Sequence, residues 1–259
     1  MAALNNTYDT YGARQFRRFF RQETAVGAGA QLLLLGLLGV ATGLGPMGWL
    51  AGLVFAVATW AILTRALSRS WPRQPFGPAN GVTLARATLV GGVTALVAEA
   101  LTARPPVALL VALTAVALVL DAVDGKVARR TGTSSALGAR FDMEVDAFLI
   151  LVLSGYVALS LGPWVLLIGA MRYVFVAAAR ALPWLNNPLP PSFARKTVAA
   201  LQGILLLLAA SALLPHLATL AVTVLALALL TWSFGRDVAW LWRVRVPANA
   251  PTPRVRERV

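Results

Sequence analysis

The stretch DAVDGKVARRTGTSSALGARFDMEVD, residues 121–146, decides the fold of this chain. It lies between two apolar runs, VALLVALTAVALVL (107–120) and AFLILVLSGYVALSL (147–161). Half of the ten acidic residues of the chain fall within it: Asp121, Asp124, Asp142, Glu144 and Asp146. Apolar runs of this length predict helices that cross a bilayer, where carboxylates are rare and usually functional. The stretch therefore predicts two membrane helices that share a polar site.

The composition indicates an integral membrane protein. Hydrophobic residues make up 58% of the chain and the mean hydropathy is +0.72, whereas an ordinary globular domain is about 45–50% apolar. We attribute the net charge of +13 to basic residues at helix ends, and we expect no nucleic-acid partner. The absence of cysteine excludes disulfides and thiolate metal sites, and the single histidine, His216, cannot form a zinc site alone.

The apolar runs of spanning length predict an all-α polytopic bundle of about eight spans. They are residues 25–44, 47–67, 80–103, 106–128, 136–160, 163–182, 195–214 and 216–236. We expect an N-terminal two-helix hairpin within 25–70 and a six-helix catalytic core within 76–236. A basic segment, 1–24, precedes them, and a basic, Pro-rich tail, 237–259, follows and is expected to be disordered.

Basic residues are distributed unequally between the two ends of the predicted helices. The turns on one side hold only Arg104, whereas the other side collects Arg14 to Arg21, Arg65, Arg69, Arg73, Lys126, Arg129, Arg130, Arg140, Arg180, Arg195 and Lys196. Cytoplasmic loops are enriched in lysine and arginine. We therefore expect both termini and the acidic stretch on the cytoplasmic side of the plasma membrane.

Helical spacing predicts that the carboxylates meet. Asp121 and Asp124 share one face of a helix, and Gly138, Asp142 and Asp146 share one face of the next. The intervening segment, 130–135, is short, so the two helices are expected to be antiparallel neighbours. Four carboxylates then converge, and oxygen ligands in that number suit Mg²⁺, Mn²⁺ or Ca²⁺ rather than zinc. Glu144 is expected to point away from this face.

The stretch also matches a family pattern, D-x2-D-G-x2-A-R-x8-G-x3-D-x3-D. Its fixed positions are Asp121, Asp124, Gly125, Ala128, Arg129, Gly138, Asp142 and Asp146. It resembles the signature of the CDP-alcohol phosphatidyltransferase family, and the resemblance covers residues 76–236. The resemblance implies an integral membrane enzyme, usually a homodimer, with CDP-diacylglycerol and a small alcohol as its partners. Such enzymes transfer a phosphatidyl group, or a phosphoalcohol from another CDP-alcohol, to an acceptor hydroxyl and release CMP.

The resemblance also implies residue roles. A pair of Mg²⁺ or Mn²⁺ ions would be held by Asp121, Asp124 and Asp142, with Asp146 at the metal and acting as general base. The cytidine nucleotide would be lined by Gly125, Ala128, Arg129 and Gly138.

Residues outside this pattern carry weaker predictions. Asn80, Thr83 and Arg86 resemble a family segment that borders the nucleotide, although Asn80 could simply start a helix and Arg86 could snorkel to the interface. Arg172, in the middle of an apolar run, needs a partner, and we favour an acceptor-binding role over a structural ion pair. Lys196 could join it or be a flanking charge. Ala147 departs from better-known acceptor classes, which leaves the acceptor open.

Two other function classes are a membrane transporter and a structural membrane protein. Intramembrane carboxylates also serve proton- or cation-coupled transporters, but here they cluster at one depth and paired helix breaks are not evident. A purely structural bundle would leave the glycines and the fixed gaps without a reason. Metal-dependent release of CMP separates the enzyme from both alternatives.

Overall fold

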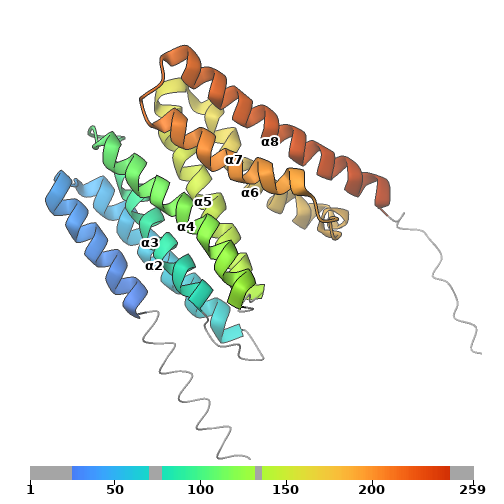
Figure 1. The fold of residues 1–259 in the computed structure, drawn as a ribbon, viewed down its shortest axis with the longest axis horizontal. Helices are drawn as coiled ribbons and strands as arrows, with labels where there is room; N and C mark the ends of the chain where they lie inside the picture. The colour runs from blue at the N-terminus through green and yellow to red at the C-terminus, as the bar shows by residue number, and fades with distance from the viewer. Residues whose placement is uncertain (1–24, 70–77, 132–135, 246–259) are drawn as a thin grey trace, which may run out of the picture.

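The computed structural model describes residues 25–69, 78–131 and 136–245. Within these ranges, the side chains of 66–69, 78–80, 124–131 and 136–137 are not described. The described residues form helices and contain no strand (Figure 1). A helix over 25–42 is followed by α2 (Pro46–Arg69), α3 (Pro78–Glu99), α4 (Val107–Thr131), α5 (Ala136–Leu161), α6 (Leu166–Ala181), α7 (Phe193–Ala210) and α8 (His216–Val244). Two short 3₁₀ helices, η1 (Pro163–Val165) and η2 (Pro183–Asn186), flank α6.

The predicted all-α bundle of membrane length is confirmed. Seven of the described helices are long and apolar enough to cross a membrane. The exception is α4, whose apolar part covers only Val107–Val123 because the acidic stretch begins there. Large apolar side chains also cover the outside of the bundle: Val40 is 91% exposed and Leu217 is 78% exposed. Such surfaces are stable in hydrocarbon but costly in water.

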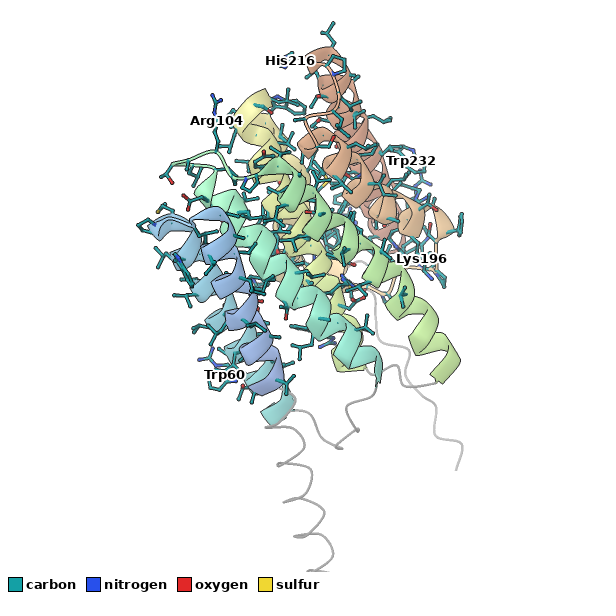
Figure 2. The ribbon with its side chains drawn as sticks, turned by 60° about the vertical axis from the view of Figure 1, so that its left-hand side comes forward. Trp60, Arg104, Lys196, His216 and Trp232 are labelled. Atoms are coloured by element: carbon teal, nitrogen blue, oxygen red, sulfur yellow. The ribbon has the colours of Figure 1, made fainter. Side chains whose placement is uncertain are left out.

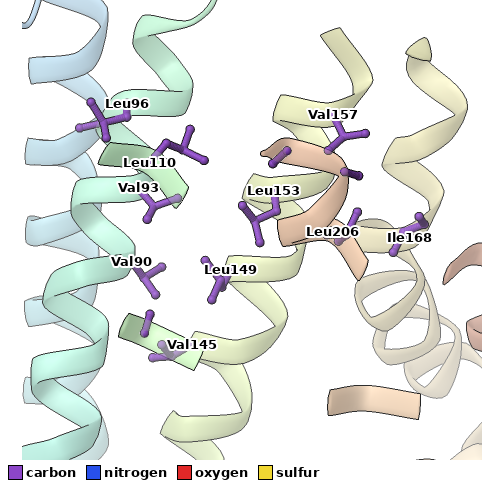
Figure 3. Close-up of a cluster of buried hydrophobic side chains, with 14 of the residues drawn as sticks. Val90, Val93, Leu96, Leu110, Val145, Leu149, Leu153, Val157, Ile168 and Leu206 are labelled. Atoms are coloured by element: carbon purple, nitrogen blue, oxygen red, sulfur yellow. The ribbon is translucent and has the colours of Figure 1, made fainter. Parts of the chain in front are cut away.

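The core of the bundle is built around α3 and α5. Valines and leucines of α3 (Val90, Val93) face those of α5 (Val145, Leu149) in a continuous buried cluster (Figure 3). The N-terminal hairpin packs on α3 through α2, while α4 and α5 cover other faces of α3. The central helix of the molecule is therefore α3, and both the hairpin and the acidic helices are attached to it.

The expected direct packing between the two acidic helices is wrong in one respect. Along their described lengths α4 and α5 have little direct packing, whereas each packs closely against α3. The short connection between them favoured neighbouring helices, but it did not determine that each would pack mainly against a third helix. Their carboxylates consequently meet beside α3.

The hairpin is tied to α3 at the end opposite the acidic stretch. The carboxylate of Glu99, which is only 9% exposed, accepts hydrogen bonds from the backbone N–H groups of Gly45 (2.9 Å) and Gly48 (3.2 Å). These amides lie at the N-terminal end of α2, just before and within its first turn, where backbone donors have no partner within the helix. Further along, the amide of Gln31 lies against Gly91 of α3, where any Cβ would collide with it. Glu99 of the core thus caps α2 of the hairpin, and Gly91 of the core leaves space for Gln31 of the hairpin.

The last helix is longer than the sequence predicts. The final span was expected to end at 236 and the residues beyond it to be disordered, but α8 continues to Val244. The reason is a second apolar cluster in which fully buried Leu241 packs with Leu185 and Ala179. Residues 237–244 are therefore part of the bundle.

Among the residues that the structure describes, the basic side chains are distributed along the bundle as the sequence predicts. Figure 2 places Arg104 and His216 toward one end of the molecule and Trp60 toward the other. Arg65, Arg180, Arg195 and Lys196 all lie near helix termini at the end opposite Arg104. The acidic ends of α4 and α5 are at this same basic end.

Candidate functional site

Three carboxylates from α4 and α5 converge beside α3. Asp121 comes from α4, and Asp142 and Asp146 come from successive turns of α5. One carboxylate oxygen from each lies within 4.8 Å of the others. The convergence follows from the helical spacing of Asp142 and Asp146, which places both on one face. Asp124 is in α4, one turn beyond Asp121, but its side chain lies outside the described part of the structure.

The three carboxylates share one arginine. Arg86 of α3 is fully buried, and its Nη1 donates to Asp121 at 2.7 Å and also to Asp142. Its Nη2 donates to Asp146. The acid side chains themselves are 33–44% exposed. The cluster is therefore closed toward α3 by a cation and open on its other side.

The donor set of the cluster fits a hard divalent cation. Its oxygens come from carboxylates alone, without imidazole or thiolate, and such oxygens are the ligands that Mg²⁺ and Mn²⁺ prefer. Their partial exposure leaves room for water or substrate oxygens to complete the coordination. The alternative of a zinc site has no support here, since zinc sites are usually built from histidine and cysteine.

The residues predicted to line a nucleotide are only partly described. Thr83 is buried one helical turn before Arg86 on α3, and Gly138 lies one turn before Asp142 on α5. The side chains of Asn80, Gly125, Ala128 and Arg129 fall outside the described residues. Their backbone shows that α3 begins at Pro78, so Asn80 is not the residue that starts this helix. The positions are compatible with one site, and their roles stay a prediction.

Arg86 does not snorkel to the interface, which was the alternative to its predicted place beside the nucleotide. A snorkelling arginine extends its guanidinium to the interface, but the guanidinium of Arg86 is buried among carboxylates. The sequence did not reveal this contact, because an arginine at the basic end of a membrane helix fits a topological role equally well.

Arg172 forms an ion pair with the acid that was expected to point away. Its Nη2 donates to Glu144 at 2.5 Å, and its Nη1 lies 3.5 Å from the sulfur of Met143. Arg172 is also within electrostatic reach of Asp146. Glu144 was the one carboxylate of residues 121–146 without a role predicted from the sequence. This unassigned acid was the signal in the sequence that could have identified the partner of Arg172. Lys196 lies exposed at the start of α7 (Figure 2). No described contact joins it to Arg172.

A comparison with known families decides the affiliation. The family model described as CDP-alcohol phosphatidyltransferase matches residues 76–232, which is more than half of the chain. The chain belongs to the CDP-alcohol phosphatidyltransferase family. No curated protein and no solved structure matches it. As a CDP-alcohol phosphatidyltransferase, the chain is a multi-pass membrane protein and a transferase of substituted phosphate groups, and its carboxylates lie within the matched segment.

Proposed function

We propose that this phosphatidyltransferase transfers the phosphatidyl group of CDP-diacylglycerol to the hydroxyl of a small alcohol and releases CMP. The observation that carries the proposal is the convergence of Asp121, Asp142 and Asp146 at one end of a membrane bundle. A lipid donor needs a site that both the bilayer and water can reach. Helices of spanning length and partly exposed carboxylates support such a site.

The metal belongs to the proposal as well. Asp121, Asp124 and Asp142 would hold Mg²⁺ or Mn²⁺, with Asp146 beside them, and a pair of ions is expected. A bound divalent cation offsets the negative charge of the pyrophosphate and of the CMP leaving group. The protein contributes three carboxylates already gathered within 4.8 Å of one another.

Asp146 is proposed as the general base. It takes the proton of the acceptor hydroxyl, and the alcohol oxygen then forms a bond to the phosphorus that carries the diacylglycerol. The bond from that phosphorus to the bridging oxygen of CMP breaks, and CMP leaves with the electron pair. A base must lie within hydrogen-bond reach of the hydroxyl, and the side chain of Asp146 is exposed enough, at 44%, for an alcohol to approach.

The remaining assignments concern the substrates and the assembly. Gly125, Ala128, Arg129 and Gly138 are proposed to line the cytidine nucleotide, together with Asn80, Thr83 and Arg86. Arg172 and Lys196 are proposed to bind an acceptor, and two cations would suit one that carries phosphate. The site is proposed to face the cytoplasm at the plasma membrane, and the enzyme to be a homodimer.

The first test is metal-dependent CMP release by the purified chain from CDP-diacylglycerol. Acceptors are glycerol 3-phosphate, inositol, inositol phosphate, serine, glycerol and phosphatidylglycerol, each with Mn²⁺ or Mg²⁺ and with EDTA. Metal-dependent release with one acceptor supports the proposal and identifies the acceptor. Absence of both CMP release and CDP-diacylglycerol binding would refute it and favour the transporter.

The base is tested by replacing Asp146 with asparagine. Asp146→Asn keeps the shape of the side chain and removes the proton acceptor, so turnover should fall by about 10²–10⁴-fold while CDP-diacylglycerol binding persists. The matched control is Glu99→Gln, which makes the same chemical change at the opposite end of the bundle and should keep turnover. Near-normal turnover of Asp146→Asn would show that another group is the base.

A further inference from the structure

The proposed reaction does not require that a buried arginine bind the metal-site carboxylates. Arg86 is fully buried, and its guanidinium contacts Asp121 of α4 and both Asp142 and Asp146 of α5. An arginine offers five N–H donors in a planar fork that matches carboxylates. One side chain of α3 therefore joins the two helices that supply the proposed metal ligands.

The carboxylates and the arginine depend on each other. Three carboxylates with oxygens within 4.8 Å repel one another unless a cation lies among them. The guanidinium, in turn, is costly to bury without partners of opposite charge. Because the acid side chains are partly exposed and Arg86 is not, the acids could turn to water whereas the arginine could not.

A divalent cation bound through the Oδ1 atoms of the three carboxylates would use the same oxygens as Arg86. The three oxygens that accept from Arg86 are the Oδ1 atoms of Asp121, Asp142 and Asp146, the residues grouped as possible metal ligands. A cation bound there has to share or displace the guanidinium. The displaced fork is suited to a phosphate oxygen of the donor.

We propose that Arg86 is a counter-cation built into the site. It holds the three carboxylates together on α3 when no metal is bound, and it weakens the binding of a divalent cation by competing for their oxygens. The inference rests on the metal role in the proposed function and extends it. The metal can then bind and leave reversibly, because a cation neutralises the three carboxylates both with the metal and without it.

The opposite role makes the opposite prediction. If Arg86 only orients the carboxylates as ligands, its removal should loosen them and weaken metal binding. If it competes with the metal, its removal should strengthen metal binding and leave the metal-free protein less stable. The sign of the change in affinity distinguishes the two roles.

The test uses the full chain with Arg86→Met, which keeps much of the side-chain bulk and removes the charge, and with Arg86→Lys, which keeps a charge. Mn²⁺ binding is measured without substrate, from the EPR signal of free Mn²⁺, and thermal unfolding is followed in EDTA and in Mn²⁺. Arg86→Met should bind Mn²⁺ about tenfold or more tightly than wild type. It should also unfold at a lower temperature in EDTA and gain more from Mn²⁺ than wild type does. Arg86→Lys should fall between them.

Equal or weaker Mn²⁺ binding by Arg86→Met overturns the proposal, as does unchanged stability in EDTA. If Arg86→Met folds only when purified with Mn²⁺, that result supports the structural half of the proposal, and the Mn²⁺ affinity of Arg86→Lys then decides the competition. Failure of the proposed function is seen separately. It appears as absent CMP release by wild type, which can occur while the order of Mn²⁺ affinities holds.

Discussion

Glu99→Ala should release the N-terminal hairpin from α3 while leaving the rest of the bundle folded. The carboxylate of Glu99 accepts two hydrogen bonds from the first turn of α2, from Gly45 and Gly48. Alanine removes the one oxygen, Oε2, that accepts both hydrogen bonds, together with the negative charge that favours a helix N-terminus. Apolar contacts of the hairpin with α3, such as the approach of Gly52 to Ala95, are untouched by the substitution, so the change acts on docking.

The geometry sets the size of the effect. A hydrogen bond to a charged group contributes about 1.5–3 kcal/mol, but water can replace the carboxylate at a helix end near the interface. We therefore expect Glu99→Ala to weaken docking by about 2–3 kcal/mol in total, and Glu99→Gln, which keeps an oxygen acceptor but loses the negative charge, by about 1 kcal/mol. Since about 1.4 kcal/mol is a tenfold change, Glu99→Ala should raise the undocked population by about 30- to 140-fold.

The chain has no cysteine, so a single introduced thiol can report docking. Ala95 is fully buried on α3 and packs where Gly52 of α2 approaches. In the Ala95→Cys background, the rate of N-ethylmaleimide labelling should rise with the undocked population. Val157→Cys, buried at 1% exposure in the core on α5, is the control for global unfolding.

Two results would contradict this reasoning. If Glu99→Ala leaves the labelling of Ala95→Cys unchanged, the two hydrogen bonds do not hold the hairpin. If labelling of Ala95→Cys and Val157→Cys rises equally, Glu99 stabilises the whole bundle and not the hairpin in particular.

Two packing predictions test the other end of the chain. Gly169→Ala should destabilise the protein by about 1–3 kcal/mol, because its Cβ would meet the backbone of Leu151. The control is Gly155→Ala, which has open space around it and should not destabilise the protein. Equal thermal stability of the two variants would argue against close α5–α6 packing. Leu241→Ala should cost about 2–5 kcal/mol because the side chain is fully buried. Val244→Ala, at an exposed position, should cost little; similar unfolding curves for these two would mean that the end of α8 is not packed.

The sequence contained enough information to place the helices and to gather the acids. Apolar runs of membrane length have few alternatives to helices, because every backbone group must be hydrogen-bonded within the segment. Asp142 and Asp146 are four residues apart, so they share a face in any helix that contains both. These predictions depend on local geometry, which a sequence determines directly.

Partners across helices could not be predicted in the same way. Arg86 looked like one more basic residue at a helix end, and only the packing of α3 against both α4 and α5 shows that it binds their acids. For Arg172 the sequence required a partner but did not identify Glu144. Leu241 lies among tryptophans and arginines that suggest an interface, and its burial depends on Leu185, far away in the sequence.

The cap that Glu99 provides also bears on how the protein is divided into parts. The family match begins at residue 76, so Glu99 and Gly91 belong to the matched core, yet each accommodates a residue of the hairpin. A core excised at that boundary would carry a carboxylate without its helix terminus and a bare glycine where Gln31 lay. The transplantable unit of this enzyme is thus longer than its family match.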